Sequence, residues 1–406
     1  MYVKLAWRNI WRNKRRTMIT VSSIMFAVVC ALFIESLERG AHNQMIDNMT
    51  SFHTGHIQVQ DYRYDDEPSL DNSFFFDDEF SRRLKSLNDN IQYVVPRIET
   101  FMLAAGSEQT RGAMVLGIDP DAEQQLNELQ DRITQGRFFE PGDGSVVVGE
   151  GLAGRLNLAL GDSLVLLGQG KFGMTASGLF EINGLVNHPI REMNNQVVYI
   201  SIPDAQWLLS ADEHITNLLI TPVHSGYTNE IAADLHSDLT NEEMRVLTWR
   251  EMMPDLIDAI EFDAMQTRFM MGILYVVIGF GIFGTILTMT LERMREFGIL
   301  LSVGMQRAKL SIVVFIETFF ISILGILAGY GLGSLVLLYF FYNPIQLSGD
   351  MEDLILEFGF EPILPVAFDP EIYFWQGLII FIITTIICLY PSLKIARLSI
   401  LDAART

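Results

Sequence analysis

Four long apolar segments constrain the fold of this 406-residue chain more than any other feature of its sequence. They cover residues 17–36, 269–291, 310–342 and 373–390. A helix needs about 20 apolar residues to cross a bilayer, and helices of soluble proteins are seldom apolar over such a length. The segments therefore predict four membrane-spanning helices, of which the third is long enough to tilt or to protrude.

The ends of two of these segments carry further information. The residues after the first segment, 37–44, lack the small-x-small pattern of a cleavage site, so we expect a retained anchor rather than a secretory signal peptide. Pro391 follows the fourth segment directly. We expect this proline to end the fourth helix, because it lacks the backbone N–H that a helix uses.

Basic residues indicate the orientation of the chain. Thirteen of the 28 Lys and Arg residues lie in the short segments 1–16, 292–309 and 391–406. The positive-inside rule places such segments in the cytoplasm, together with both termini. Segments 37–268 and 343–372 are then extracytoplasmic, and their many carboxylates account for the net charge of −21. This acidity argues against nucleic acid as a partner, because nucleic-acid binding needs a basic surface.

The segment 37–268 is long enough for one large or two small globular domains, and its pattern is that of an α+β domain. Alternating apolar and polar residues between Gly, Pro and Asp turns predict strands, and longer periodic stretches predict helices. We expect strands at 56–60, 145–149, 163–167 and 196–200, and helices at 77–87, 122–133, 203–209 and 225–239.

Two loops of this domain resemble ligand-binding loops but have simpler interpretations. The acidic stretch 65–78 lacks the spacing and the turn glycine of a calcium-binding EF-hand, which favours a solvated loop. The glycine-rich stretch 168–178 lacks the Lys-Ser/Thr pair of a phosphate-binding loop and predicts the tip of a hairpin. Its Phe172 and Met174 would then be exposed and available to a partner or a substrate.

No pattern of metal ligands or of catalytic residues emerges. His53 and His56 fall in a loop entering a strand, without a third ligand at a suitable spacing. Cys30 and Cys388 lie inside apolar segments, so they indicate neither a disulfide nor a metal site. The sequence G-x-S-x-G of serine hydrolases does not occur. We therefore expect no catalytic residue and no metal.

The N-terminal segment 1–16 predicts an amphipathic helix in the inner membrane interface. Trp7 and Trp11 alternate with Arg8 and Arg12 in this stretch. At 3.6 residues per turn, the tryptophans could lie at headgroup depth while the arginines contact lipid phosphates. A basic flank that only follows the positive-inside rule is the alternative.

The segment 292–309 predicts a short helix at the cytoplasmic base of the membrane. Charged residues precede an apolar turn that is too short to span the bilayer and is flanked by glycines. A charged face of this kind is suited to docking in a groove of a soluble partner. The residues concerned are Glu292, Arg293, Arg295, Glu296, Gly298 and Gly304.

Three motifs resemble the FtsX/MacB superfamily of ABC-transporter membrane subunits. They are Leu5-Ala-Trp-Arg-Asn-Ile-Trp-Arg-Asn-Lys-Arg-Arg16, Glu292-Arg-Met-Arg-Glu-Phe-Gly-Ile299 with Gly304, and residues 391–405, which begin Pro-Ser and end Ala-Ala-Arg. The resemblance covers the whole layout of one span, a large outer domain and three further spans. It implies an α-helical membrane protein with four transmembrane helices and a MacB-like periplasmic α+β core between the first and the second.

Within that superfamily, the outer domain looks like that of the lipoprotein-releasing LolC/LolE type. The resemblance lies in residues 95–97, 116–120, 136–139, 147–150, 160–162 and 204–206. In the LolC type, a hairpin loop captures the periplasmic lipoprotein carrier. The stretch 168–178 occupies a similar place but is shorter and glycine-rich.

The resemblance implies a non-catalytic permease in a bacterial inner membrane. A Walker A sequence is absent, so ATP and Mg²⁺ are expected to bind a separate cytoplasmic ATPase dimer and not this chain. A second permease subunit, identical or related, and lipoproteins with their carrier are the further expected partners. Only Glu35 and Glu317 carry charge within the spans, which favours helices that transmit motion over a polar channel. A MacB-like peptide or drug exporter and an FtsX-like regulator of a cell-wall hydrolase are the alternatives.

Overall fold

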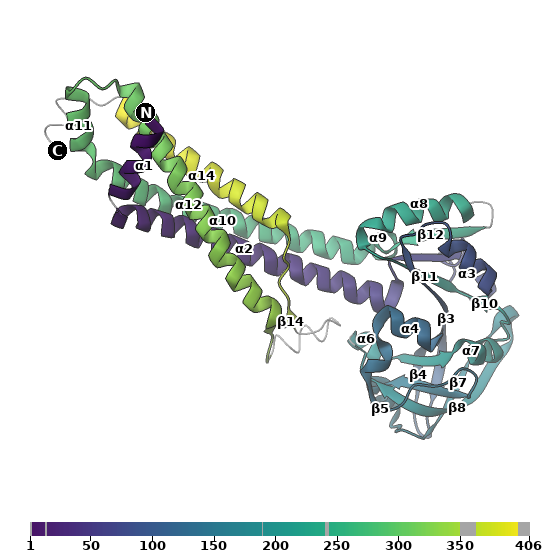
Figure 1. Ribbon diagram of the computed structural model, residues 1–406. Helices are drawn as coiled ribbons and strands as arrows, with labels where there is room; N and C mark the ends of the chain where they lie inside the picture. Colours follow the sequence, from purple (N-terminus) through teal and green to yellow (C-terminus); the bar gives the residue numbers. More distant parts are fainter. Residues whose placement is uncertain (1, 13, 189, 240–242, 350–362, 397–406) are drawn as a thin grey trace. The chain divides into compact units, whose positions relative to one another are not determined.

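The structure is a computed structural model, and its chain divides into two compact units that are described separately (Figure 1). It describes residues 2–12, 14–188, 190–239, 243–349 and 363–396. The helical unit comprises Met1–Asn43, Ala259–Gln346 and Ile363–Thr406, and the other unit is built mainly from Gln44–Asp258. Part of the predicted acidic loop 343–372 and the tail from residue 397 onward lie outside the described residues.

Four helices among the described residues are long and apolar enough to cross a membrane, as predicted. They are α2 (Lys14–Met49), α10 (Pro254–Glu292), α12 (Arg307–Tyr342) and α14 (Pro370–Ala396). Helices α2 and α10 run well past the predicted ends of their spans, so the second unit begins later and ends earlier than the predicted 37–268. The reason is that no proline interrupts residues 37–49 or 255–268.

The prediction that Pro391 ends the fourth helix is wrong, because α14 continues through it to Ala396. A proline removes one helical hydrogen bond, but packing against a neighbouring helix can offset the loss. Here α14 packs along α12, and Ser311 Oγ donates a hydrogen bond of 3.0 Å to the carbonyl oxygen of Ser392. The carbonyl that loses its helical donor is that of Ile387, four residues before Pro391, so it is the packing of α14 along α12, with this contact, that holds the helix together here.

Helices α2 and α12 meet along a row of glycines. Gly325 and Gly329 lie one turn apart on α12, and a Cβ added to either would lie 2.6 Å from the Cβ of Ile24 or of Val28 on α2. Gly333 continues the row opposite Leu32, with 3.0 Å to the nearest side-chain atom. Small residues at this spacing let two helices approach closely in a membrane, where van der Waals packing drives their association.

Two short helices complete the helical unit. They are α1 (Tyr2–Arg12) and α11 (Met294–Ser302), and the short strands β13 (Ile345–Gln346) and β14 (Ile363–Leu364) pair antiparallel. Helix α1 is amphipathic, and its buried Ala6 and Ile10 lie on the side that packs against α12. Helix α11 separates α10 from α12, as the segment 292–309 predicts.

The second unit is an α+β domain, as predicted. It is built on a ten-stranded mixed sheet. The strands follow the order β12-β1-β11-β3-β4-β9-β6-β8-β5, and β7 pairs with β3 and β8. Most neighbours are antiparallel, but β4 runs parallel to β9 and β6 parallel to β8. The bounds are β1 (Ile57–Asp61), β3 (Ile91–Ala105), β4 (Thr110–Ile118), β5 (Ile133–Gly136), β6 (Ser145–Gly149), β7 (Ser163–Gln169), β8 (Thr175–Val186), β9 (Val197–Ser201), β11 (Asn217–Pro222) and β12 (Met244–Thr248).

Helices and a smaller two-stranded sheet surround this sheet. The helices are α3 (Asp78–Lys85), α4 (Pro120–Asn127), α5 (Glu150–Leu156), α6 (Arg191–Asn194), α7 (Ile202–Leu209), α8 (Thr228–Leu239) and α9 (Trp249–Met252). The two-stranded sheet joins β2 (Phe74–Phe75) to β10 (His214–Ile215). The four predicted strands are confirmed to within a few residues. The predicted helix 122–133 is interrupted, because Glu128 adopts a left-handed conformation with φ 53° that ends α4 and starts a 3₁₀ turn.

An ion pair lies in the interior of this domain. The side chains of Arg97 on β3 and Glu123 on α4 are 2% and 0% exposed. The guanidinium donates through Nε at 2.5 Å and through Nη2 at 2.9 Å to the two carboxylate oxygens. Tyr199 is also buried here, and burial together with the charge of Glu123 raises the pKa of its hydroxyl. The attraction and the two hydrogen bonds of this pair offset the free-energy cost of removing both charges from water.

Candidate functional site

Helix α11 is held on the helical unit by an apolar face of its own. Met294, Phe297 and Leu301 are buried and pack with Leu310, Val314 and Ile395 in a small cluster. The helix ends in a Schellman motif, in which Met305 N–H donates to the Leu300 carbonyl at 3.0 Å and Gly304 N–H to that of Leu301 at 3.1 Å. Gly304 has φ 102°, which explains why a glycine is needed here, whereas Gly298 is buried inside the helix.

A buried ion pair joins the start of α11 to α12. Arg293 precedes α11 and is 4% exposed, and Glu317 of α12 is 2% exposed. Arg293 Nη1 donates to Glu317 Oε1, and the guanidinium lies 5.4 Å from the centre of the Phe297 ring. Glu317 is therefore one half of the contact that fixes the α10–α11 junction against the third apolar helix.

Two more ion pairs connect the N-terminal segment to this junction. Arg12 pairs with Glu296, and Arg16 Nε lies 2.7 Å from Glu292 Oε2. All four side chains are between 39% and 56% exposed, so each pair alone is worth at most about 1 kcal/mol. Glu292 and Glu296, predicted to face a partner, are here engaged within the chain. Arg12, predicted to contact lipid phosphates, is engaged with Glu296 in the same way.

The outward surface of α11 consists of other residues. Arg295 is exposed and forms no ion pair within the part of the chain that the structure describes. Beside it, Ile299 and Leu300 are 57% and 39% exposed, and Val303 in the following turn is 82% exposed. These three apolar residues are not among the site residues predicted from the sequence. Their spacing, with Ile299 and Val303 four residues apart, is the signal that could have identified one face of a helix.

Helix α1 matches the predicted amphipathic pattern. Trp7 and Trp11 are 42% and 52% exposed, their rings lie 6.0 Å apart, and Arg8 is exposed. Trp7 also makes an edge contact with Phe320 of α12, at 5.5 Å between ring centres. Trp7 is thus packed against an apolar helix, while both tryptophans keep about half of their side-chain surface exposed.

Two cavities surround this junction. An open groove of about 690 Å³ lies between the start of α2 and the end of α10, and Lys14 and Arg15 line it with Thr285 and Thr288. A smaller cavity of about 300 Å³ lies between α1, α11 and α12 and reaches Glu317. The junction therefore combines a rigid charged core with open space beside it.

The predicted hairpin tip at 168–178 is confirmed in the second unit. Strands β7 and β8 pair antiparallel, and a 3₁₀ turn joins them at Lys171–Gly173. Phe172 and Met174 are 78% and 55% exposed. The N–H of Phe172 donates to Asp71 Oδ1 at 2.6 Å, which supports the left-handed φ of 56° at this residue. Burial lowers the pKa of Lys171, and the nearby charge of Asp71 opposes this shift.

Two family models match the chain, and together they cover both units. The MacB-like periplasmic core domain matches residues 17–238, which is more than half of the chain. The FtsX-like permease C-terminal region matches residues 268–400. The first match includes α2 and the α+β domain as far as residue 238, and the second begins inside α10 and includes α11, α12 and α14.

Relatives among characterised proteins are distant but extensive. The lipoprotein-releasing system transmembrane protein LolC of Neisseria meningitidis serogroup B is 21% identical over 332 residues, covering 79% of this chain and 76% of that protein. LolC of Xylella fastidiosa is 22% identical over 331 residues and covers 76% of each chain. The macrolide export ATP-binding/permease protein MacB 2 of Aeromonas hydrophila is 20% identical over 392 residues, covering 90% of this chain and 57% of that protein.

A solved structure of the periplasmic region of MacB from Actinobacillus actinomycetemcomitans aligns with a TM-score of 0.37 at 15% identity, covering 53% of this chain and 98% of that one. The assignment rests instead on the two family models and on the order of the elements along the chain, with the α+β domain between the first and the second of the four apolar helices. The chain belongs to the FtsX/MacB superfamily of ABC-transporter permeases, and the LolC proteins are among its relatives.

Proposed function

We propose that this permease uses ATP hydrolysis by a separate cytoplasmic ATPase dimer to release lipoproteins from a bacterial inner membrane toward the outer membrane. The LolC relatives, matched over 76% of their length, support this cargo. The termini and α11 lie in the cytoplasm and the α+β domain in the periplasm, in agreement with the distribution of basic residues. ATP and Mg²⁺ bind the ATPase, and a second permease subunit completes the complex.

The observation that carries the proposal is the construction of α11. Its outer surface is an apolar patch, Ile299, Leu300 and Val303, beside the cation Arg295. Arg293, at the start of the helix, is buried and tied to Glu317 of α12, while Glu296, on the same exposed face as the patch, pairs with Arg12 of the N-terminal segment. Closure of the ATPase dimer on the patch therefore displaces the helices themselves, and the chain acts by mechanical transmission.

Replacing Val303 with aspartate is expected to weaken binding of the ATPase by about tenfold or more. The side chain is 82% exposed, so the fold loses little, whereas a charge in an apolar contact forfeits the burial of a valine, worth about 1.5–3 kcal/mol. The measurement is the amount of ATPase that copurifies with the tagged permease. Val223→Asp, at an exposed valine of the α+β domain, is the matched control. Equal recovery with V303D and V223D would contradict docking at this patch.

A charge reversal at Glu296 is expected to uncouple ATP hydrolysis from release. In the E296K variant, the introduced ammonium group faces the guanidinium of Arg12, and repulsion moves the N-terminal segment away from α11. We expect insertion and basal ATP hydrolysis to persist while lipoprotein release per ATP falls severalfold. The reverse charge pair, R12E with E296K, is expected to recover part of the release. Normal release by E296K alone would show that the Arg12–Glu296 pair has no role in coupling.

The cargo is tested by isolating the tagged permease from gently solubilised membranes and identifying the bound proteins by mass spectrometry. An ABC ATPase with acylated proteins supports lipoprotein release. An ATPase with an outer-membrane channel supports the second candidate, peptide or drug export, which the match of MacB 2 to 90% of this chain favours. An ATPase with a cell-wall hydrolase overturns both.

A further inference from the structure

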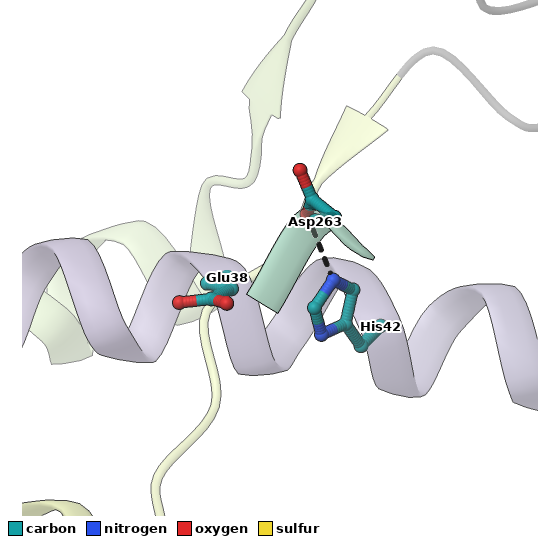
Figure 2. A group of neighbouring side chains, drawn as sticks. All are labelled: Glu38, His42 and Asp263. Atoms are coloured by element: carbon teal, nitrogen blue, oxygen red, sulfur yellow. Dashed lines mark hydrogen bonds and ion pairs between the residues drawn. The ribbon is translucent and has the colours of Figure 1, made fainter. Parts of the chain in front are cut away.

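A histidine and two carboxylates meet where α2 and α10 extend beyond the predicted spans. Glu38 and His42 lie one helical turn apart on α2, and Asp263 approaches them from α10 (Figure 2). One ligand atom of each side chain lies within 4.8 Å of the other two. His42 Nε2 is 2.9 Å from Asp263 Oδ2, and the histidine side chain is 14% exposed.

The charges around this cluster are mixed. Glu35 and Asp263 lie near Glu38, and so do the guanidinium groups of Arg268 and Arg39. Among the described residues, neither Glu38 nor Asp263 forms an ion pair with a lysine or arginine. The neighbouring Arg39 is engaged elsewhere, with Asp369 at 2.5 Å and Glu371 at 3.0 Å.

The donor set identifies the kind of cation. Imidazole nitrogen suits zinc and other first-row transition metals, whereas calcium and magnesium prefer oxygen ligands alone. One imidazole and two carboxylates supply three protein ligands, and water can take the remaining position of a tetrahedral zinc ion. The pair Glu38 and His42 shares one face of α2, which is how two ligands of a metal site can come from one helix.

We propose that Glu38, His42 and Asp263 form a binding site for a divalent transition metal ion of the Zn²⁺ class, which fastens α2 to α10. The ion takes the place of the proton between His42 and Asp263, so His42 Nε2 coordinates while Nδ1 carries the ring proton. No metal site is predicted from the sequence here, because Asp263 is 221 residues from His42 and the three ligands therefore form no local spacing motif. The site goes beyond lipoprotein release and does not depend on it.

The test uses the purified full chain in detergent after treatment with a chelator. Equilibrium dialysis against Zn²⁺ is expected to yield one tightly bound equivalent, and Co²⁺ is expected to give the visible absorption of a site with a nitrogen ligand. His42→Ala and Asp263→Asn are expected to weaken binding by at least about tenfold. The matched controls are His224→Ala and Glu261→Gln, two changes of the same kind outside the cluster. Both are expected to leave the one tightly bound equivalent of Zn²⁺ unchanged.

A thermal measurement checks that the ion links the helices. Zn²⁺ is expected to raise the unfolding temperature of the unaltered chain and of H224A but not of H42A, because a ligand stabilises the state that binds it. Melting curves without metal show whether H42A and D263N fold. Absence of the tight equivalent from the unaltered chain, or its retention in folded H42A and D263N, would overturn the proposal. Neither result bears on the cargo or on the ATPase.

Discussion

Replacing Glu123 with alanine is expected to lower the free energy of unfolding of the α+β domain by about 3–5 kcal/mol. The substitution leaves the guanidinium of Arg97, which is 2% exposed, without its counter-charge inside the protein. For a domain of this size the loss corresponds to a fall of roughly 6–20 °C in the unfolding temperature. The measurement is a thermal melt of the full chain in detergent, followed by circular dichroism.

Two control variants make this result specific. The double substitution R97M with E123L removes both charges and is expected to recover most of the lost stability, because apolar side chains of similar volume can replace a buried pair. Asp65→Ala removes one partner of the Arg245–Asp65 pair, whose side chains are 45% and 48% exposed, and is expected to cost less than about 1 kcal/mol. Equal melts for E123A and D65A would contradict the importance assigned to the buried pair.

Replacing Glu317 with alanine is expected to have the second large effect, this time on coupling. It leaves Arg293 buried at the α10–α11 junction with only the half-exposed Glu296, 3.5 Å from its Nε, as a counter-charge, at a cost of up to about 3–5 kcal/mol. Moving α11 outward so that Arg293 reaches water relieves this cost. We therefore expect α11 to detach and the copurified ATPase to fall by at least about tenfold.

Two further variants distinguish the loss of the Arg293–Glu317 pair from a general destabilisation of the fold. Glu292→Ala removes one partner of a pair that is about 40% exposed, and it is expected to leave ATPase recovery within about twofold. The uncharged pair R293M with E317L is expected to restore α11 to its place and with it the bound ATPase. Full recovery of the ATPase with E317A alone would show that the buried pair does not position α11.

The sequence predicts the architecture well because its signals are local. The four apolar segments, the strand at 145–149 and the short helix between residues 292 and 309 each follow from a pattern within a few turns of chain. The two exceptions differ in origin, one being tertiary and the other local. Pro391 lies inside a helix because α12 supports it, and Glu128 interrupts one because its backbone is left-handed.

The site is less predictable because its contacts join distant parts of the chain. Arg12 and Glu296 are 284 residues apart, and Arg293 and Glu317 are 24 apart, so neither pair leaves a periodic trace. The sequence indicates charged residues around 292–296 but not that Arg293 among them is buried. It also does not indicate that Ile299, Leu300 and Val303 lie at the exposed surface.

The row of glycines between α2 and α12 has a mechanical consequence. Gly325 and Gly329 lie directly against Ile24 and Val28 of α2, whose β-branched side chains have few rotamers with which to absorb a displacement. Two helices in such close contact resist bending and resist sliding past each other, because a densely packed interface leaves little room for movement. In the proposed mechanism, a push delivered to α12 through Glu317 would therefore move α2 together with α12.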